Sequence, residues 1–264
     1  MVPDTHIHTS LCRHAEGTPA EFKAAAHRQG IPEIAFTDHL PNPDGYDSRH
    51  RMTMDEWPKY RELVLAQQTA DPPRVLCGAE SDYYEGCDKS LCPRLAGLRL
   101  DLLLGSIHHI GRWGFDNPDE HHVWKTVDVT GAWREYFALL GRLADLRLVD
   151  VIGHLDLPKK FGHRPPDRVV KEMAKPILDR IAAAGMAIEL NSSGLRKPVA
   201  EIYPAGFLLV LAHEREIPIC FGSDAHRPQE VGYRFDDSLK LARQTGYSQA
   251  VHFSGRRKIF YPLP

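Results

Sequence analysis

Short apolar runs alternate with helix-forming stretches along almost the whole chain. Two of those stretches begin with capping boxes, Thr18 to Glu21 and Thr53 to Glu56, which mark helix starts. Predicted strands cover residues 4–8, 33–37, 75–80, 101–106, 149–153, 186–190 and 217–222, and a terminal strand is placed near 250–253. Predicted helices cover residues 18–30, 53–68, 131–146, 168–184, 202–215 and 228–244. Repeated strand–helix units are typical of an α/β fold with a parallel sheet, either closed into a barrel or open and doubly wound.

The composition is that of an ordinary globular protein. With 264 residues, 42% of them hydrophobic, the chain is long enough for one large domain or two small ones. It contains no evident linker, low-complexity stretch or internal repeat, so we predict a single domain over residues 1–264. The 33 Lys and Arg residues nearly balance the 35 Asp and Glu residues, which argues against nucleic acid as a partner and leaves a small anionic substrate open.

The N-terminal segment and the cysteines bear on location. Asp4 and His6 stand where a signal peptide would need an apolar core, and no apolar run reaches the length of a membrane span. The five cysteines form no CxxC pair, and their odd number fits reduced thiols better than a disulfide framework. We therefore expect a cytoplasmic protein without a membrane partner. The oligomeric state stays open.

Polar residues gather where the predicted strands end. These residues are His8, Asp38, His39, Glu80, His108, His154, Asn191, Asp224 and His226. In a barrel of parallel strands, the C-terminal strand ends form one rim, and active sites are built there. The pattern therefore favours a barrel with its active site on that rim.

The string Asp4-Thr5-His6-Ile7-His8 has the spacing of a metal-binding strand. Alternate strand residues share a face, so Asp4, His6 and His8 can converge on one cation, although the string taken alone fits a solvent-facing polar strand equally well. His, Asp and Glu without cysteine form a donor set for zinc, manganese or ferrous iron. Packing so many titratable groups together without cations would be costly, which favours a centre with several metal ions.

Four segments of the chain resemble the signature of the polymerase and histidinol phosphatase (PHP) family of metal-dependent phosphoesterases. They are Asp4-Thr5-His6-Ile7-His8, Thr37-Asp38-His39, Ile152-Gly153-His154 and Ser223-Asp224-Ala225-His226. The resemblance implies a distorted TIM-like (β/α)7 barrel that holds three divalent metal ions. It places the first on His6, His8, Glu80 and Asp224, the second on Glu80, His108 and His154, and the third on His14, His39 and His226. Because a carboxylate can bridge two cations, Glu80 is expected to be shared.

Catalytic and phosphate-binding residues are expected near the same rim. The expected catalytic residues are Asp4, Asp38, Glu80, Asp224 and His226, with Asp4 orienting a histidine or a water rather than binding metal. Phosphate ester hydrolysis suits such a centre, because cations bind phosphoryl oxygens and activate water. The candidates for binding the substrate are Lys159, Lys160, Arg164, Asn191 and Arg196, of which Lys160 and Arg196 are placed first. The loop over residues 41–51 is either a lid or a plain surface loop.

Within the family, the chain is similar to the stand-alone histidinol phosphatases. The segments over residues 153–162 and 224–228 carry this similarity, so L-histidinol phosphate is the expected substrate. Acidic residues at 44, 47 or 82 are candidates for meeting its amino group. The alternatives are a PHP phosphodiesterase or nuclease, a broad phosphomonoesterase, an amidohydrolase-type deaminase or peptidase, and a non-catalytic metal-stabilised scaffold. Zinc, iron and manganese all remain open as the metal.

Overall fold

The strands of the protein form two parallel sheets in a computed structural model that describes residues 1–42, 45–87, 95 and 97–264. The first sheet contains β1 (Asp4–Ile7), β2 (Glu33–Phe36) and β3 (Arg74–Cys77), in that order. The second runs β10 (Ile219–Gly222), β9 (Ala187–Asn191), β8 (Val151–Ile152), β5 (Leu103–Ser106) and β4 (Ala79–Asp82). Every pairing in both sheets is parallel, as the alternation of strands and helices predicts.

The two sheets meet along two edges to give a distorted barrel. Strands β3 and β4 belong to one extended segment, in which only Gly78 separates them. At the other edge, Ile7 of β1 forms a parallel bridge with Ala225 beyond β10, and the N–H of His8 donates to the Ala225 carbonyl at 2.9 Å. Counting β3 and β4 as one, the barrel has seven strand positions, which confirms the expected architecture.

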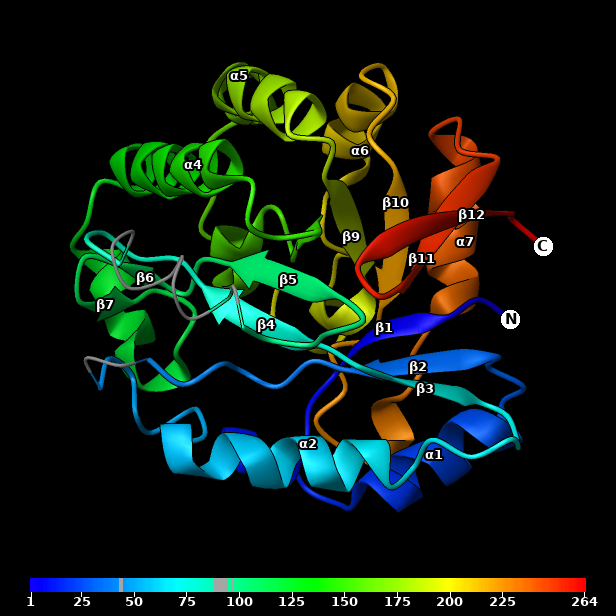
Figure 1. The fold of residues 1–264 in the computed structure, drawn as a ribbon. Coiled ribbons are helices and arrows are strands. Elements are labelled where there is room, and N and C mark those ends of the chain that lie inside the picture. Colours follow the sequence, from blue (N-terminus) through cyan, green and yellow to red (C-terminus); the bar gives the residue numbers. More distant parts are fainter. Residues whose placement is uncertain (43–44, 88–94, 96) are drawn as a thin grey trace.

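Helices surround the barrel on its outside (Figure 1). They are α1 (Pro19–Arg28), α2 (Trp57–Leu65), α4 (Val129–Leu146), α5 (Asp167–Ala183), α6 (Gly206–His213) and α7 (Phe235–Gln244). The predicted capping box at α1 is present, because the Thr18 hydroxyl accepts from the Glu21 N–H while the Glu21 carboxylate accepts from the Thr18 N–H. Among the described residues, no helix combines the length and the apolar character that crossing a membrane requires.

The connections after the strands contain short 3-10 helices and a small hairpin. The 3-10 helices are η1 (Ser10–Cys12), η2 (Met54–Glu56), η3 (Pro118–Lys125), η4 (Leu157–Phe161), η5 (Ser192–Arg196) and η6 (Pro228–Glu230). The hairpin pairs β6 (His109–Ile110) with β7 (Trp113–Gly114). These elements build up the end of the barrel toward which β4 and β5 point (Figure 1).

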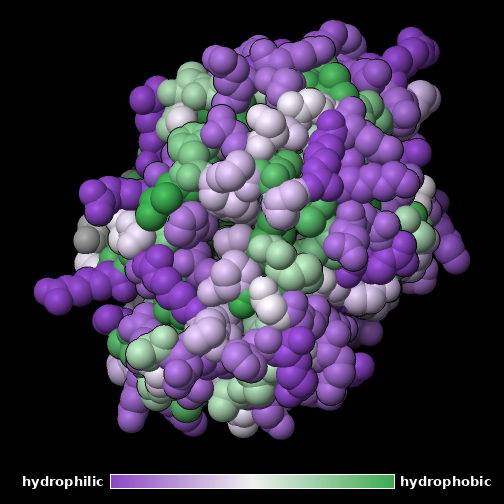
Figure 2. Space-filling view, turned by 90° about the vertical axis from the view of Figure 1, so that its right-hand side faces the viewer, coloured by the Kyte–Doolittle hydropathy of each residue, from purple (hydrophilic) through white to green (hydrophobic). Residues whose placement is uncertain are grey.

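An antiparallel hairpin of β11 (Gln249–Ser254) and β12 (Arg257–Pro262) covers the end where the strands begin. Val251 and Phe253 of β11 pack with Leu104, Val151 and other alternate strand residues in a buried apolar cluster. Hydrophilic side chains make up most of the surface at this end (Figure 2). The end of the barrel interior where the strands begin is therefore filled with apolar side chains. The polar side chains lie at the opposite end, where the strands finish.

Two helices begin later than the sequence predicts. The segment before α6 pairs with the sheet, because the N–H of Tyr203 donates to the Asn191 carbonyl at 2.9 Å and the N–H of Asn191 donates back to Tyr203 at 2.7 Å. This bridge delays α6 to Gly206 instead of residue 202. Likewise, η6 and a turn come before α7, which starts at Phe235 instead of residue 228. The strand β12 and the β6–β7 hairpin were not predicted.

Candidate metal centre

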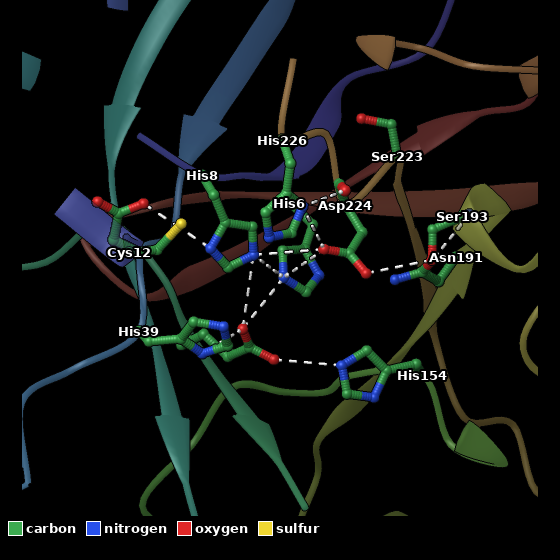
Figure 3. A network of polar contacts seen from close by, with 12 residues as sticks. His6, His8, Cys12, His39, His154, Asn191, Ser193, Ser223, Asp224 and His226 are labelled. Atoms are coloured by element: carbon green, nitrogen blue, oxygen red, sulfur yellow. Dashed lines mark hydrogen bonds and ion pairs between the residues drawn. The ribbon is translucent and has the colours of Figure 1, made fainter. Parts of the chain in front are cut away.

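Four side chains converge where β1 ends. His6 Nε2 lies 3.0 Å from His8 Nε2 and 3.4 Å from Glu80 Oε2. Asp224 Oδ1 lies 3.3 Å from His8 Nε2 and 3.8 Å from His6 Nε2 (Figure 3). Ligand atoms about 2.1 Å from a tetrahedral zinc ion are about 3.4 Å apart, so these spacings fit a shared cation. They are the four residues of the expected first site.

The Glu80 carboxylate faces two different groups of imidazoles. While Oε2 faces His6 and His8, Oε1 lies 3.2 Å from His154 Nε2 and 3.7 Å from His108 Nε2. Burial would raise the pKa of Glu80, but the neighbouring imidazoles hold it well below its usual value. An ionised carboxylate with one oxygen toward each group has the geometry that a bridge between two cations requires.

Two of the three residues of the expected third site lie close together, and His39 lies beside them. His14 Nε2 and His226 Nε2 lie 2.9 Å apart. His39 instead has its Nδ1 at 3.0 Å from Glu80 Oε2 and 3.8 Å from Asp82 Oδ1, while its ring centre is 5.8 Å from that of His14. His39 therefore lies between the His14–His226 pair and the Glu80 carboxylate.

The donor set of the cluster fits divalent cations. Imidazole nitrogens that face each other at 2.9–3.0 Å need either a proton between them or a shared cation. The Nδ1 atoms of His8 and His154 are buried and have no hydrogen-bond partner among the described residues. Cys12 was not predicted as part of this region, yet its sulfur lies within 4.8 Å of ligand atoms of His8 and His226, and burial raises the pKa of its thiol. Nitrogen and carboxylate donors dominate, as zinc, iron and manganese sites require.

Asp4 and Asp38 stabilise the backbone around the cluster. The Asp4 carboxylate accepts from the Ser223 N–H at 2.9 Å and from the Ser223 hydroxyl at 2.6 Å. It thus fixes the turn that carries Asp224, whereas the sequence suggested that it orients a histidine or a water. The Asp38 carboxylate accepts from the backbone and the hydroxyl of Thr9, in the turn that follows His8.

Glu189 and Asp82 face the Nδ1 atoms of two histidines of the cluster. The sequence did not predict this orienting role for either carboxylate. Glu189, on β9, accepts from His6 Nδ1 at 2.7 Å and from the His154 N–H at 3.0 Å. Asp82 lies 3.0 Å from His108 Nδ1. Such carboxylates orient an imidazole so that its other nitrogen faces the metal. For Glu189, the sequence signal was an acidic residue between apolar residues of a strand, since acidic side chains are rarely buried without a partner.

A cavity of about 470 Å³ opens above the cluster, and Lys160 and Arg196 line it. Lys160 Nζ donates to the Asp116 carbonyl at 2.6 Å and to its carboxylate at 3.0 Å. Arg196 Nη2 donates to the carbonyls of Ser223 and Asp224 at 3.0 and 3.1 Å, while its Nη1 has no partner among the described residues. The side chains of Lys160 and Arg196 are therefore held beside the cluster of histidines and carboxylates, and each has an N–H left to donate to an anion.

Three of the predicted substrate-binding residues point elsewhere. Lys159 is fully buried, and its ammonium group binds the Glu201 carboxylate at 3.2 Å. Arg164 binds the same carboxylate from the surface at 3.0 Å, beside a separate shallow pocket. The Asn191 amide donates to Glu189 Oε2 at 3.0 Å below the cluster. The described lining of the cavity includes none of these three side chains, and each is already paired with a carboxylate elsewhere.

In the loop over residues 41–51, the described part contributes Asp47 and His50 to the cavity, and the Asp47 carboxylate is already paired. Residue 44, one candidate for the amino group of the substrate, lies outside the described residues. The other two candidates, Asp47 and Asp82, both bind Arg51, at 2.9 and 2.6 Å. The Tyr46 hydroxyl donates to the turn between β6 and β7, which ties the loop to the neighbouring hairpin. Whether this loop moves as a lid stays a prediction.

Comparison with known proteins agrees with this geometry. Residues 4–193 match the model of the PHP domain, and residues 209–234 match that of a PHP-associated region. A probable histidinol-phosphatase of Deinococcus radiodurans is 44% identical over 256 residues, which cover 96% of this chain and 97% of that protein. The histidinol-phosphatase of Bacillus subtilis is 27% identical over 90% of this chain and 98% of its own length.

The fold also matches a solved structure. The histidinol phosphate phosphatase of Lactococcus lactis, determined with zinc, L-histidinol and phosphate, superposes with a TM-score of 0.82 at 19% identity, over 98% of this chain and 100% of that one. The likeness supports the TIM-like barrel. Because the PHP domain model covers most of the chain and the Deinococcus relative covers nearly all of it, the protein belongs to the PHP family.

Proposed function

We propose that the protein is a histidinol-phosphatase, which hydrolyses L-histidinol phosphate to L-histidinol and inorganic phosphate. The observation that carries the chemistry is the Glu80 carboxylate, which lies between two groups of imidazoles in a cavity that Lys160 and Arg196 also line. The choice of substrate is supported by the 44% identity with the Deinococcus protein over nearly the full length of both chains. A phosphomonoester of this size fits a cavity of about 470 Å³.

The proposed centre holds three divalent cations, for which zinc, iron and manganese are the candidates. His6, His8, Glu80 and Asp224 would hold the first, Glu80, His108 and His154 the second, and His14, His39 and His226 the third. When bound, the cations would neutralise phosphoryl charge and make water a better nucleophile at neutral pH. Zinc has direct precedent in the lactococcal structure.

The side chains of this protein orient the substrate above that centre. Lys160 and Arg196 enter from two sides of the cavity, and each has donors left for a phosphoryl oxygen. The Ser193 hydroxyl donates to Asp224 Oδ2 at 3.1 Å, which orients the other oxygen of this carboxylate toward His8. Together these contacts would fix the ester in one orientation, so that water attacks phosphorus opposite the leaving oxygen.

An assay with three substrate classes tests the proposal. Purified, metal-replete protein should hydrolyse L-histidinol phosphate with a higher kcat/KM than other phosphomonoesters, and it should leave a short oligonucleotide intact. Equal turnover of all monoesters would indicate a broad phosphomonoesterase. Cleavage of the oligonucleotide alone would indicate a PHP nuclease. The single domain over residues 1–264 and the cytoplasmic location stay predictions from the sequence.

A further inference from the structure

Tyr203 lies in the segment between β9 and α6 and forms part of the wall of the cavity. Its side chain is 1% exposed. Its hydroxyl has no hydrogen-bond partner among the residues that the structure describes. Buried hydroxyls are nearly always paired in proteins, because an unpaired one loses its bonds to water without replacement. A residue of the cavity wall therefore carries a buried hydroxyl that lacks a partner among the described residues.

The backbone and the ring of Tyr203 are both held by neighbouring residues. The N–H and the carbonyl of Tyr203 both bond to Asn191. Lys159 Nζ donates to the Ile202 carbonyl at 2.8 Å and lies 5.2 Å from the centre of the tyrosine ring. Gly194 packs against the ring so closely that a Cβ on it would lie 2.8 Å from Tyr203 Cε2. Because the ring cannot turn toward bulk water, the partner of the hydroxyl has to come through the cavity.

The hydroxyl can act as a hydrogen-bond donor. Burial is the main cause that raises the pKa of Tyr203 well above its usual value. Asp116 and Asp224 line the same cavity as the tyrosine. A phenolic hydroxyl has one proton to donate, so it can form a hydrogen bond to an oxygen of a ligand in that cavity.

We propose that Tyr203 is a catalytic residue whose hydroxyl donates a hydrogen bond to the leaving oxygen of the bound phosphate ester. The role rests on the proposed phosphatase function. In hydrolysis, a water oxygen forms the new bond to phosphorus, and the ester P–O bond breaks with its electron pair going to the leaving oxygen. One proton of that water ends on the alcohol, so the tyrosine keeps its own. Lys160 and Arg196 serve the other phosphoryl oxygens, whereas the leaving oxygen, where charge grows, needs a donor of its own.

The leaving group provides a direct test. Tyr203→Phe removes only the hydroxyl, so kcat for an alkyl phosphate such as L-histidinol phosphate should fall about 100-fold. An aryl ester, 4-nitrophenyl phosphate, releases an anion that is stable without a donor, and its kcat should fall less than about threefold. An equal loss for both esters, or no loss for either, would overturn the proposal. An equal loss is what a merely structural role would produce.

Two controls accompany this variant. Tyr261→Phe, on β12, removes another buried hydroxyl without a partner among the described residues, outside the lining of the cavity, and should change neither rate. The metal content of Tyr203→Phe should equal that of the unmodified protein. If the protein hydrolyses simple alkyl phosphates but not L-histidinol phosphate, the proposed substrate fails and the comparison proceeds with the best alkyl ester. If it hydrolyses no phosphomonoester, both proposals fail.

Discussion

At the scale of single residues, the charge of Glu80 is the feature on which metal binding depends most. Glu80→Gln keeps the shape of the side chain but removes the anionic oxygens that face His6 and His154. We expect the variant to retain less metal by elemental analysis and to lose phosphatase turnover by at least about 1000-fold, since both proposed cation sites share this group. Glu33→Gln is the matched control, because Glu33 is equally buried but binds Arg74 and His252. Full metal content and activity in Glu80→Gln would exclude the bridging role.

Two adjacent lysines should respond differently to the same substitution. Lys160 faces the cavity, so Lys160→Met should raise KM for the phosphate ester about 10- to 100-fold. The side chain of its partner Asp116 is 20% exposed, so stability should fall less than in Lys159→Met. Lys159 is fully buried against Asp156 and Glu201. Lys159→Met leaves the buried Asp156 carboxylate without its cation, whereas Glu201 keeps Arg164, and the free energy of unfolding should fall by about 3 kcal/mol. Steady-state kinetics and urea unfolding of both variants measure the difference, and identical profiles would contradict it.

At the scale of the elements, the close packing of β10 against β1 and β9 depends on a glycine. A Cβ on Gly222 would lie 1.9 Å from Glu189 Oε1 and 2.8 Å from His6 Cβ. Gly222→Ala should therefore displace Glu189 from His6, lower the free energy of unfolding by about 1–3 kcal/mol and reduce the metal content. Gly185→Ala, after α5, is the control for the effect of added bulk on metal content, because among the described residues, its chain neighbours aside, no heavy atom lies within 4 Å of the added Cβ. Unchanged metal content and stability in Gly222→Ala would refute this account of the packing.

The strand–helix order and the metal ligands could be predicted because they depend on local sequence. Where a strand is followed directly by His or Asp, as β1 is by His8, the sequence alone shows which ligand lies at the strand end. Contacts across the barrel could not be predicted in this way. Glu189 reaches His6 from a strand 183 positions away, and the lysine at 159 differs from that at 160 only in the direction that η4 gives it. Tyr203 was missed because its pairing with Asn191 replaces a predicted helical turn.

At the scale of the whole molecule, the proposed cations would link strand ends from all around the barrel. Two expected ligands lie within strands, His6 in β1 and Glu80 in β4, and the others follow β1, β2, β5, β8 and β10. Cations bound to the folded state alone stabilise it, by about 2.7 kcal/mol when their free concentration is 100 times the dissociation constant. Chelation should therefore lower the melting temperature, and zinc or manganese should restore it.

The same experiment separates the two ends of the barrel. The hairpin of β11 and β12 is attached at the other end, where Arg256 Nε donates to Asp150 Oδ2 at 2.9 Å and its Nη2 donates to Oδ1 at 3.1 Å. Arg256→Met should lower the melting temperature in the presence and absence of chelator by the same amount, because distant sites add independently. Calorimetry of both proteins with and without chelator gives the four values required. A chelator effect that disappears in Arg256→Met would show that the two ends are coupled.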